Sequence, residues 1–343
     1  MKLLVIGGTR FVGRHFVTAA VGRGHEVTLF NRGTQAPVEG VETIQGDRHR
    51  DLAKLEGRRW DAVLDMCGFL PRAVKASAEA LRNSVDVYVF VSSISVYADV
   101  SRPGVDETGA LATLTQEQLD KANAIAPSTA PAAAYGDMYG GLKTLCEQAA
   151  EEAMPGRVLI LRPGLIVGPY DYTDRFTYWV ARVARGGNVL APGRPQRHIQ
   201  FIDARDLADW TVTMIEQKRT GVYNCNGLPG DVTMGNLLDE CKAVSGSDAS
   251  FVWVDEEFLA REQIGAWGEL PLWLPESEES LKGFMFVKSD KAIEAGLTFR
   301  SLTETVADTL AWYQTTPATE KLKAGLDPEK EKRLLGQWEN TSS

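Results

Sequence analysis

The sequence lacks the features that mark several large classes of protein. Its four cysteines lie far apart without a CxxC pair, and its four histidines match no metal-ligand spacing. We therefore expect neither a disulfide framework nor a metal centre in this chain of 343 residues. No apolar run approaches the length that spans a bilayer. We also expect no signal peptide before the first predicted strand, which begins at Lys2, and the expected compartment is the cytoplasm.

Concentrated positive charge is missing as well. The formal net charge is -9 at pH 7, and no Lys/Arg run is long enough to form a basic patch. An acidic chain repels phosphate backbones, so nucleic acid is not an expected partner. Neither a membrane nor a nucleic acid is predicted, and the expected partner is a small-molecule substrate.

Short apolar runs alternate with helical patterns through the first hundred residues. The run at residues 2–7 is continuously apolar, as in a central parallel strand that is covered on both faces. The remaining predicted strands are 26–30, 42–45, 61–66 and 85–92, and the predicted helices are 11–23 and 71–81. This alternation predicts an α/β fold with a Rossmann-type, doubly wound parallel sheet.

The later composition predicts a smaller C-terminal substrate lobe. Beyond Gly168 the chain has more Trp and Pro and loses its regular periodicity. The regular pattern is lost over 99–134, and the stretch 122–134, rich in Ala, Pro, Ser and Thr, is interpreted as a surface loop or flap. The predicted dinucleotide-binding domain comprises residues 1–168, and the chain returns to it at 201–226 and at about 286–315. The predicted substrate lobe comprises 169–200 and 227–285, and a polar tail follows at 319–343.

A glycine-rich loop follows the first strand and opens the first helix. Its residues, all candidate cofactor contacts, are Gly7, Gly8, Thr9, Arg10, Phe11, Val12 and Gly13. A diphosphate needs backbone N–H groups close to it at a helix N-terminus. Gly7 permits the tight turn, Gly8 the close approach, and Gly13 the packing of the helix on the strand.

The charges near this loop favour NADP over NAD. Arg10 stands where a glycine is common; it either pairs with a 2′-phosphate or the diphosphate, or is a solvated loop residue. The second strand ends at Asn31 and Arg32, without the acidic residue that usually binds the ribose of NAD. Asp47, after the third strand, is a candidate for the adenine amino group or an ordinary loop carboxylate.

Two further motifs predict acid–base chemistry. The fifth strand leads into Ser93 and Ser95, at the edge where active sites of parallel sheets collect. Tyr139 and Lys143 lie one helical turn apart on one face, and a nearby ammonium lowers the pKa of a tyrosine. Tyr135 has no lysine four residues on and is not the candidate.

Two later segments complete the set of candidate contacts. Pro163, after the next predicted strand, belongs to a segment that can wrap the nicotinamide end of a cofactor or serve as a hinge between lobes. Arg197 is a candidate substrate contact, whereas His198 has no partner spacing and is read as structural.

Together these motifs resemble the short-chain dehydrogenase/reductase superfamily, in its extended, epimerase/dehydratase-like branch. The segments that carry the resemblance, in the family's order, are GGTRFVG, SSISVY, YGGLK, LRPGLIVGP and FIDARDLA. The resemblance implies that Ser93, Tyr139 and Lys143 form a catalytic triad in which Tyr139 exchanges a proton with the substrate. Lys143 would hold the nicotinamide ribose, and Ser93 the reacting oxygen. It also implies a homodimer.

The resemblance leaves the reaction open. Dehydratases of the branch carry Asp-Glu after the serine, where this chain has Ile94-Ser95, so elimination is disfavoured. We expect NAD(P)-dependent hydride transfer at a secondary alcohol or ketone of a small hydroxylated, sugar-like substrate, by a reductase or an epimerase. The loop and YGGLK also resemble an atypical subgroup that includes chloroplast stem-loop RNA-binding proteins. The alternative is therefore a non-catalytic nucleotide-sensing or RNA-binding protein on the same fold.

Overall fold

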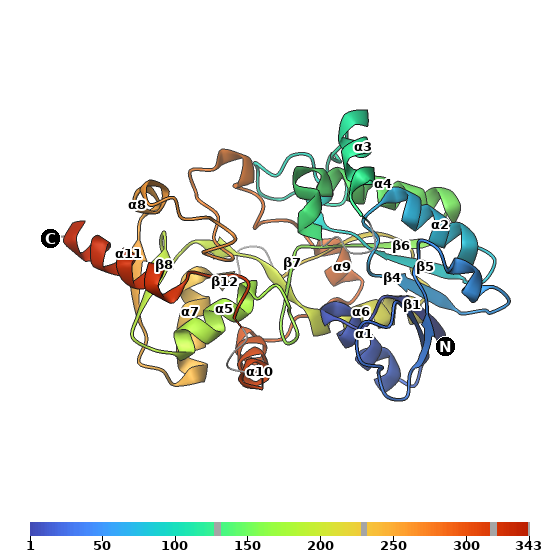
Figure 1. Ribbon diagram of the computed structural model, residues 1–343, viewed down its shortest axis with the longest axis horizontal. Coiled ribbons are helices and arrows are strands. Elements are labelled where there is room, and N and C mark those ends of the chain that lie inside the picture. Colours follow the sequence, from blue (N-terminus) through green and yellow to red (C-terminus); the bar gives the residue numbers. More distant parts are fainter. Residues whose placement is uncertain (127–131, 228–231, 316–320, 342–343) are drawn as a thin grey trace.

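The computed structural model describes residues 1–126, 132–227, 232–315 and 321–341. Part of the Ala/Pro/Ser/Thr-rich segment at 127–131 lies outside them. In these ranges no helix has both the length and the apolar character needed to cross a membrane. Figure 1 shows two lobes side by side, with the N-terminus in one and the C-terminus at the far end of the other.

One lobe is built on a seven-stranded sheet of order β11-β6-β5-β4-β1-β2-β3, with every neighbouring pair parallel. The strands are β1 (Lys2–Ile6), β2 (Glu26–Asn31), β3 (Glu42–Gln45), β4 (Ala62–Asp65), β5 (Val87–Val91), β6 (Val158–Pro163) and β11 (Gly221–Cys225). The order reverses between β1 and β4, which is the switch point where ligands bind in such sheets. The predicted α/β, Rossmann-type fold is confirmed.

Helices cover both faces of this sheet. Helix α1 (Phe11–Gly22) packs beside α6 (Ala204–Glu216) on one face, and α2 (Pro71–Leu81) packs beside α4 (Tyr139–Ala153) on the other. Because strand side chains alternate, Leu3 and Val5 enter one apolar cluster while Leu4 and Ile6 enter the other. The continuous apolar run in β1 follows from this double burial.

The second lobe has its own apolar core, with Trp179 and Phe258 fully buried in it. Its elements are α5 (Arg175–Ala184), β8 (Asn188–Pro192), β9 (His198–Ile199), β12 (Val232–Thr233), α7 (Met234–Ser245), β13 (Ser250–Val254), α8 (Glu256–Arg261), η4 (Glu279–Leu281), α10 (Leu302–Gln314) and α11 (Pro328–Thr341). The connecting elements are η1 (Leu52–Leu55), η2 (Ile94–Val96), α3 (Gln116–Ala124), η3 (Ala132–Met138), β7 (Leu165–Val167), β10 (Phe201–Asp203) and α9 (Asp290–Glu294).

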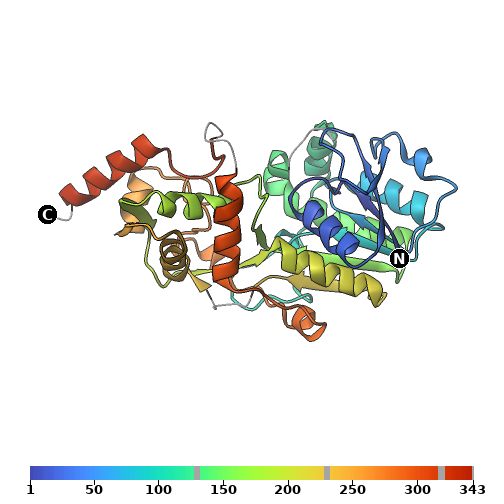
Figure 2. The same cartoon turned by 90° about the horizontal axis from the view of Figure 1, so that it is seen from below.

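The end of the chain differs from the sequence-based prediction. Residues 286–315 were expected to return to the sheet domain. Helix α9 packs there, on β11, and Leu297 after it joins the apolar cluster of that lobe, but α10 does not follow. Helix α10 packs on α5 and α7 because Val306 and Leu310 join the core of the second lobe. Figure 2 shows α10 standing at the end of this lobe nearest the sheet.

The segment expected to be a polar tail is also part of the second lobe. Glu331 of α11 accepts a hydrogen bond from Arg182 Nε at 2.6 Å, and both side chains are buried. Leu334, one turn of helix later, is fully buried. The helix is polar on one side only, and its other side packs onto the lobe.

The insertion at 99–134 contains a helix, α3, where the sequence analysis found no regular pattern. Thr115 accepts from the N–H of Gln118, and the Gln118 side chain accepts from the N–H of Thr115, so the two form a capping box at the start of α3. The signal was present in the sequence as Thr-x-x-Gln ahead of a helical pattern.

A buried ion pair holds the loops at the carboxyl edge of the sheet. Arg48, after β3, donates to both carboxylate oxygens of Asp65, at the end of β4, at 2.6 and 2.7 Å. Tyr88 donates to the same carboxylate at 2.7 Å. Burial alone would raise the pKa of Asp65, but the Arg48 charge and these hydrogen bonds outweigh it and lower the pKa.

Removing one partner of this pair should destabilise the fold strongly. We expect Asp65→Asn to lower the free energy of unfolding by about 3–5 kcal/mol, because a guanidinium would be left buried and unpaired. Asp86→Asn is the matched control, since its ion pairs with Arg59 and Lys218 are exposed, and should cost less than about 1 kcal/mol. Urea unfolding measures both changes, and equal losses would contradict the assignment.

The effect of Asp65→Asn should also depend on pH. The lowered pKa means that the folded chain binds fewer protons at Asp65 than the unfolded chain does. The stabilisation is complete above the unfolded pKa of about 4 and is lost as the pH falls through the folded value. The difference from the unsubstituted protein should therefore shrink in acid.

Candidate functional site

The glycine loop lies at the carboxyl edge of the sheet, directly after β1. Gly7 and Gly8 have φ angles of 101° and 84°, in the left-handed region that favours glycine. A Cβ atom on Gly8 would come within 2.8 Å of Val5 Cγ1 and 2.9 Å of Leu29 Cδ2. Side chains at these positions would therefore distort the loop.

Gly13 sets the distance between α1 and the loop. A Cβ atom there would lie 2.5 Å from Gly8 Cα and 2.9 Å from the Gly8 carbonyl carbon, both main-chain atoms. Arg10 is the N-cap residue of α1 and its side chain is exposed, so the first N–H groups of the helix have no side-chain cap. Thr9, Phe11 and Val12 complete the turn, and the backbone of Phe11 is itself left-handed, with a φ of 33°. This is a cradle that fits a phosphate group.

The end of β2 carries no acidic side chain. Asn31 Oδ1 accepts from the N–H of Gly33 at 2.8 Å, while its buried Nδ2 has no partner among the described residues. Arg32 is exposed. Asp47 is buried and accepts from the N–H of His49 at 2.9 Å, as a loop carboxylate does.

Ser93, Ser95 and Tyr139 form one hydroxyl cluster. Ser93 caps η2 after β5, and its Oγ accepts from the N–H of Ser95 and donates to Ser95 Oγ, each at 3.1 Å. Helix α4, which begins at Tyr139, packs on η2, and the neighbouring Ser93 hydroxyl lowers the pKa of Tyr139. The structure thus brings together residues that are 46 positions apart in the sequence (139 − 93).

The Tyr139 hydroxyl is protonated at neutral pH. Burial raises its pKa to about 12, against the lowering effects of the Ser93 hydrogen bond and the positive charge of Arg175. Sequence reasoning missed Arg175, because its position 36 residues later (175 − 139) gives no local signal. Its guanidinium is itself partly buried, which lowers its pKa, and lies 5.5 Å from the ring centre of Trp267.

Lys143 lies on α4, one turn after Tyr139, and is buried. Its Nζ donates to the carbonyl of Val91 at 2.6 Å and to that of Gly68 at 3.0 Å, and lies 4.4 Å from the Phe90 ring centre. Burial lowers the pKa of Lys143. The spacing predicts that Lys143 lowers the pKa of Tyr139; here its hydrogens go to two main-chain carbonyls, and Arg175 has that effect instead.

Pro163 and Arg197 are the remaining candidates. Pro163 ends β6 at the same edge of the sheet, paired with Cys225 of β11. Arg197 is buried in the second lobe, where its Nη1 lies 3.5 Å from Glu276. Within the described ranges it makes no hydrogen bond or ion pair with the triad. The neighbouring His198 packs its ring on Phe286.

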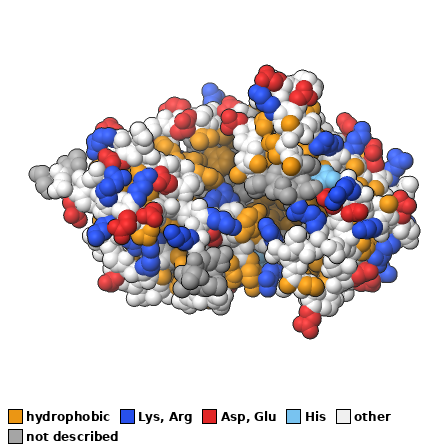
Figure 3. Space-filling view, viewed as in Figure 1, with side chains coloured by type: hydrophobic (Ala, Val, Ile, Leu, Met, Phe, Trp, Pro, Cys, Tyr) orange, Lys and Arg blue, Asp and Glu red, His pale blue; other side chains and the backbone are white. Residues whose placement is uncertain are grey.

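Figure 3 shows a hollow between the two lobes with hydrophobic side chains on its wall. A doubly wound sheet whose β1 leads into a glycine-lined helix N-terminus defines a dinucleotide-binding protein. The chain belongs to the NAD dependent epimerase/dehydratase family, whose model matches residues 3–225. The description of this family names NAD as the cofactor on which its members depend.

Two curated relatives match over most of the chain. One is a chloroplast stem-loop binding protein of 41 kDa from Arabidopsis thaliana, 24% identical over 71% of this chain and 63% of the relative. The other is a 2-alkyl-3-oxoalkanoate reductase from Stenotrophomonas maltophilia, 30% identical over 61% of this chain and 64% of the relative. The chain thus spans less than two thirds of the length of either relative.

Solved structures share the fold. A UDP-glucuronic acid 4-epimerase from Bacillus cereus, in complex with NAD, matches with a TM-score of 0.63 and 17% identity over 92% of this chain and 99% of that one. A UDP-glucose 4-epimerase matches with a TM-score of 0.66 and 16% identity over 94% and 100%. At such identities the likeness concerns the fold.

Replacing Gly13 by alanine should weaken cofactor binding. The added methyl group would meet the Gly8 main chain at 2.5 Å and displace the loop, so we expect the dissociation constants of NADP and NAD to rise by about tenfold or more. Gly22→Ala, in the same helix, is the matched control because its Cβ would meet nothing within 4 Å. Titration followed by tryptophan fluorescence measures both. Unchanged binding by the Gly13 variant would contradict the role of the loop.

Proposed function

We propose that the protein is an NADP-dependent oxidoreductase that reduces the ketone of a small hydroxylated substrate, or oxidises the corresponding alcohol. The observation that carries the proposal is the packing of α4, with Tyr139 and buried Lys143, on η2 beside Ser93, at the edge of the sheet where the glycine loop also lies. The nicotinamide cofactor, when bound, supplies or accepts the hydride.

The residues of the chain fit such a cofactor. The cradle leaves no room for side chains at Gly8 and Gly13, and the φ of Gly7 favours glycine. The orphaned Nδ2 of Asn31 offers a donor at the end of β2. Ser93 and Ser95 can donate hydrogen bonds to a carbonyl oxygen. Tyr139 can then deliver its proton to that oxygen as negative charge develops there.

The raised pKa of Tyr139 keeps its hydroxyl in the protonated form that reduction requires. With a pKa of about 12, the hydroxyl is a ready proton donor at neutral pH, but it acts as a base only when a ligand or nearby charge stabilises the phenolate. The 30% identical relative is named as a reductase of a 3-oxo compound. Epimerisation, in which the same residues would act in both directions, is the second reaction that the family supports.

The preference for NADP rests on the end of β2. Asn31 and Arg32 provide a neutral amide and an exposed cation at the place where an acidic residue would favour NAD. An arginine there suits the dianionic 2′-phosphate. Four structural neighbours are complexes with NAD, which is the alternative cofactor.

RNA binding is the second candidate, favoured by the stem-loop binding relative. The net charge of -9 opposes it. Filter binding of a stem-loop RNA across a salt series tests it, since a real interaction must weaken steeply as salt is added.

Tyr139→Phe should abolish most of the turnover. Loss of the proton donor is expected to lower kcat by about 100- to 10,000-fold while NADP still binds. Tyr135→Phe is the matched control, since that ring is buried one turn earlier and should leave turnover nearly unchanged. The assay follows reduced nicotinamide with a 2-alkyl-3-oxoalkanoate and analyses products from UDP-glucose. Full activity in the Tyr139 variant would refute the mechanism.

Arg32→Ala should reduce the affinity for NADP but not for NAD. A charged hydrogen bond contributes about 1.5–3 kcal/mol, so we expect the dissociation constant of NADP to rise by about tenfold or more. Arg102→Ala, at an exposed arginine away from β2, controls for the loss of surface charge. Calorimetric titration measures both cofactors. Tighter binding of NAD than NADP by the unsubstituted protein would overturn the assignment.

A further inference from the structure

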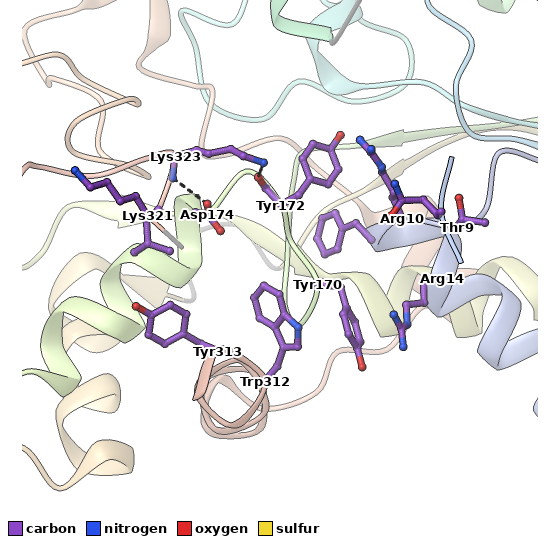
Figure 4. A pocket seen from close by; sticks show the side chains of 13 residues that line it. Thr9, Arg10, Arg14, Tyr170, Tyr172, Asp174, Trp312, Tyr313, Lys321 and Lys323 are labelled. Atoms are coloured by element: carbon purple, nitrogen blue, oxygen red, sulfur yellow. Dashed lines mark hydrogen bonds between the residues drawn. The ribbon is translucent and has the colours of Figure 1, made fainter. Parts of the chain in front are cut away.

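A cavity of about 360 Å³ lies between the two lobes, beside the glycine loop. The loop and α1 form one wall, and residues 170–174, α10 and the chain from Lys321 to Lys323 form the other. Gln35, just after the end of β2, also lines it. Figure 4 shows the rings of Tyr170, Tyr172 and Trp312 between the arginines of one lobe and the lysines of the other.

Positive charge converges on this cavity from both lobes. Arg10 and Arg14 come from the first lobe, and Lys321 and Lys323 from the second. In the part of the chain that the structure describes, Arg10, Arg14 and Lys321 make no ion pair. Asp174 is the one acidic residue among the described lining residues, and its Oδ2 accepts from the N–H of Lys323 at 2.9 Å.

Aromatic rings hold these cations in place on two sides. The Arg14 guanidinium carbon lies 4.0 Å from the ring centre of Tyr170, whose ring lies 5.6 Å from that of Trp312. Arg10 lies 6.0 Å from the ring centre of Tyr172, and Lys323 Nζ lies 5.4 Å from it. Each stack thus spans the boundary between the lobes.

The segment that carries these tyrosines is held firmly despite an unfavourable backbone. Tyr170 and Asp174 have φ angles of 68° and 62°, which non-glycine residues adopt only when their surroundings impose it. His15 Nε2, on α1, lies 2.9 Å from the carbonyl oxygen of Pro169 and ties the segment to the first lobe. Tyr172 is nevertheless half exposed, with its ring at the cavity.

Like charges gathered around a cavity repel one another, and an anion placed among them removes that repulsion. The volume falls at the lower end of small-molecule sites. We propose that this cavity binds a phosphate monoester, with Arg10 and Arg14 contributed by one lobe and Lys321 and Lys323 by the other. Such a group carries up to two negative charges and three strong acceptor oxygens.

Two kinds of molecule can carry a phosphate group of this chemistry into the cavity. Because Gln35 follows the end of β2, the 2′-phosphate of NADP is one source. This case rests on the proposed cofactor and adds the cavity cations to Arg32, the partner proposed above for the same phosphate. A phosphorylated second ligand, bound beside the cofactor, is the other. In both cases the phosphate joins the lobes, since neither lobe provides all four cations.

The test is a Lys321→Gln, Lys323→Gln double variant, titrated by calorimetry with NADP, with NAD, and with inorganic phosphate at saturating NAD. Lys75→Gln, at an exposed lysine on α2, is the matched control. A rise of about tenfold or more in the dissociation constant of NADP alone identifies the 2′-phosphate as the source. Loss of inorganic phosphate binding, with the NADP to NAD ratio unchanged, identifies a second ligand.

The proposal is overturned if the double variant binds all three probes as the unsubstituted protein does, or if phosphate and the 2′-phosphate contribute nothing to binding in either. Lys323 Nζ also donates to the Tyr172 carbonyl, so the single variant Lys321→Gln, which breaks no hydrogen bond of the described residues, must show the same direction. Lys321→Arg should restore binding. None of these titrations requires turnover. Their outcome therefore does not depend on whether the Tyr139→Phe test supports the proposed reaction.

Discussion

The site depends on how the buried ammonium of Lys143 is compensated. A charge removed from water is costly unless it is hydrogen-bonded, and Lys143 finds its acceptors in the carbonyls of Val91 and Gly68. Those carbonyls are free only because β5 and β4 end at the same edge of the sheet. The bonds fix the start of α4 against that edge, and so they place Tyr139, one turn earlier, against Ser93.

A second buried charge steadies the neighbouring loop. The Arg48–Asp65 pair fixes the chain after β4, where Cys67 Sγ lies 3.6 Å from the carbonyl oxygen of Ile6. The glycine loop therefore rests on a segment that is held by an ion pair rather than by apolar packing alone. Such an arrangement limits the rearrangement needed on binding, because the cradle is formed before any ligand arrives.

The sequence predicted what depends on local chemistry. The glycine loop, the Tyr139–Lys143 spacing and the alternation of strands and helices are each patterns of residues that lie close together in the sequence. The parallel sheet follows from that alternation. Arg175 and the packing of α10 were missed because they depend on which surfaces meet in three dimensions. Val306 and Leu310 give α10 an apolar face, but this pattern alone does not indicate which lobe the face packs on. In the structure both residues join the core of the second lobe.

The distribution of charge over the protein also depends on the tertiary structure. A chain with a net charge of -9 places four cations around one cavity, although Arg10 and Lys321 are more than 300 residues apart (321 − 10 = 311). Neither segment alone is basic enough to be noticed in the sequence. Asp174 is the one carboxylate among the described lining residues, and salt screens charges beyond about 8–10 Å. The local field at the glycine loop is therefore positive in an acidic protein, which is the condition under which an anionic cofactor binds selectively at that edge.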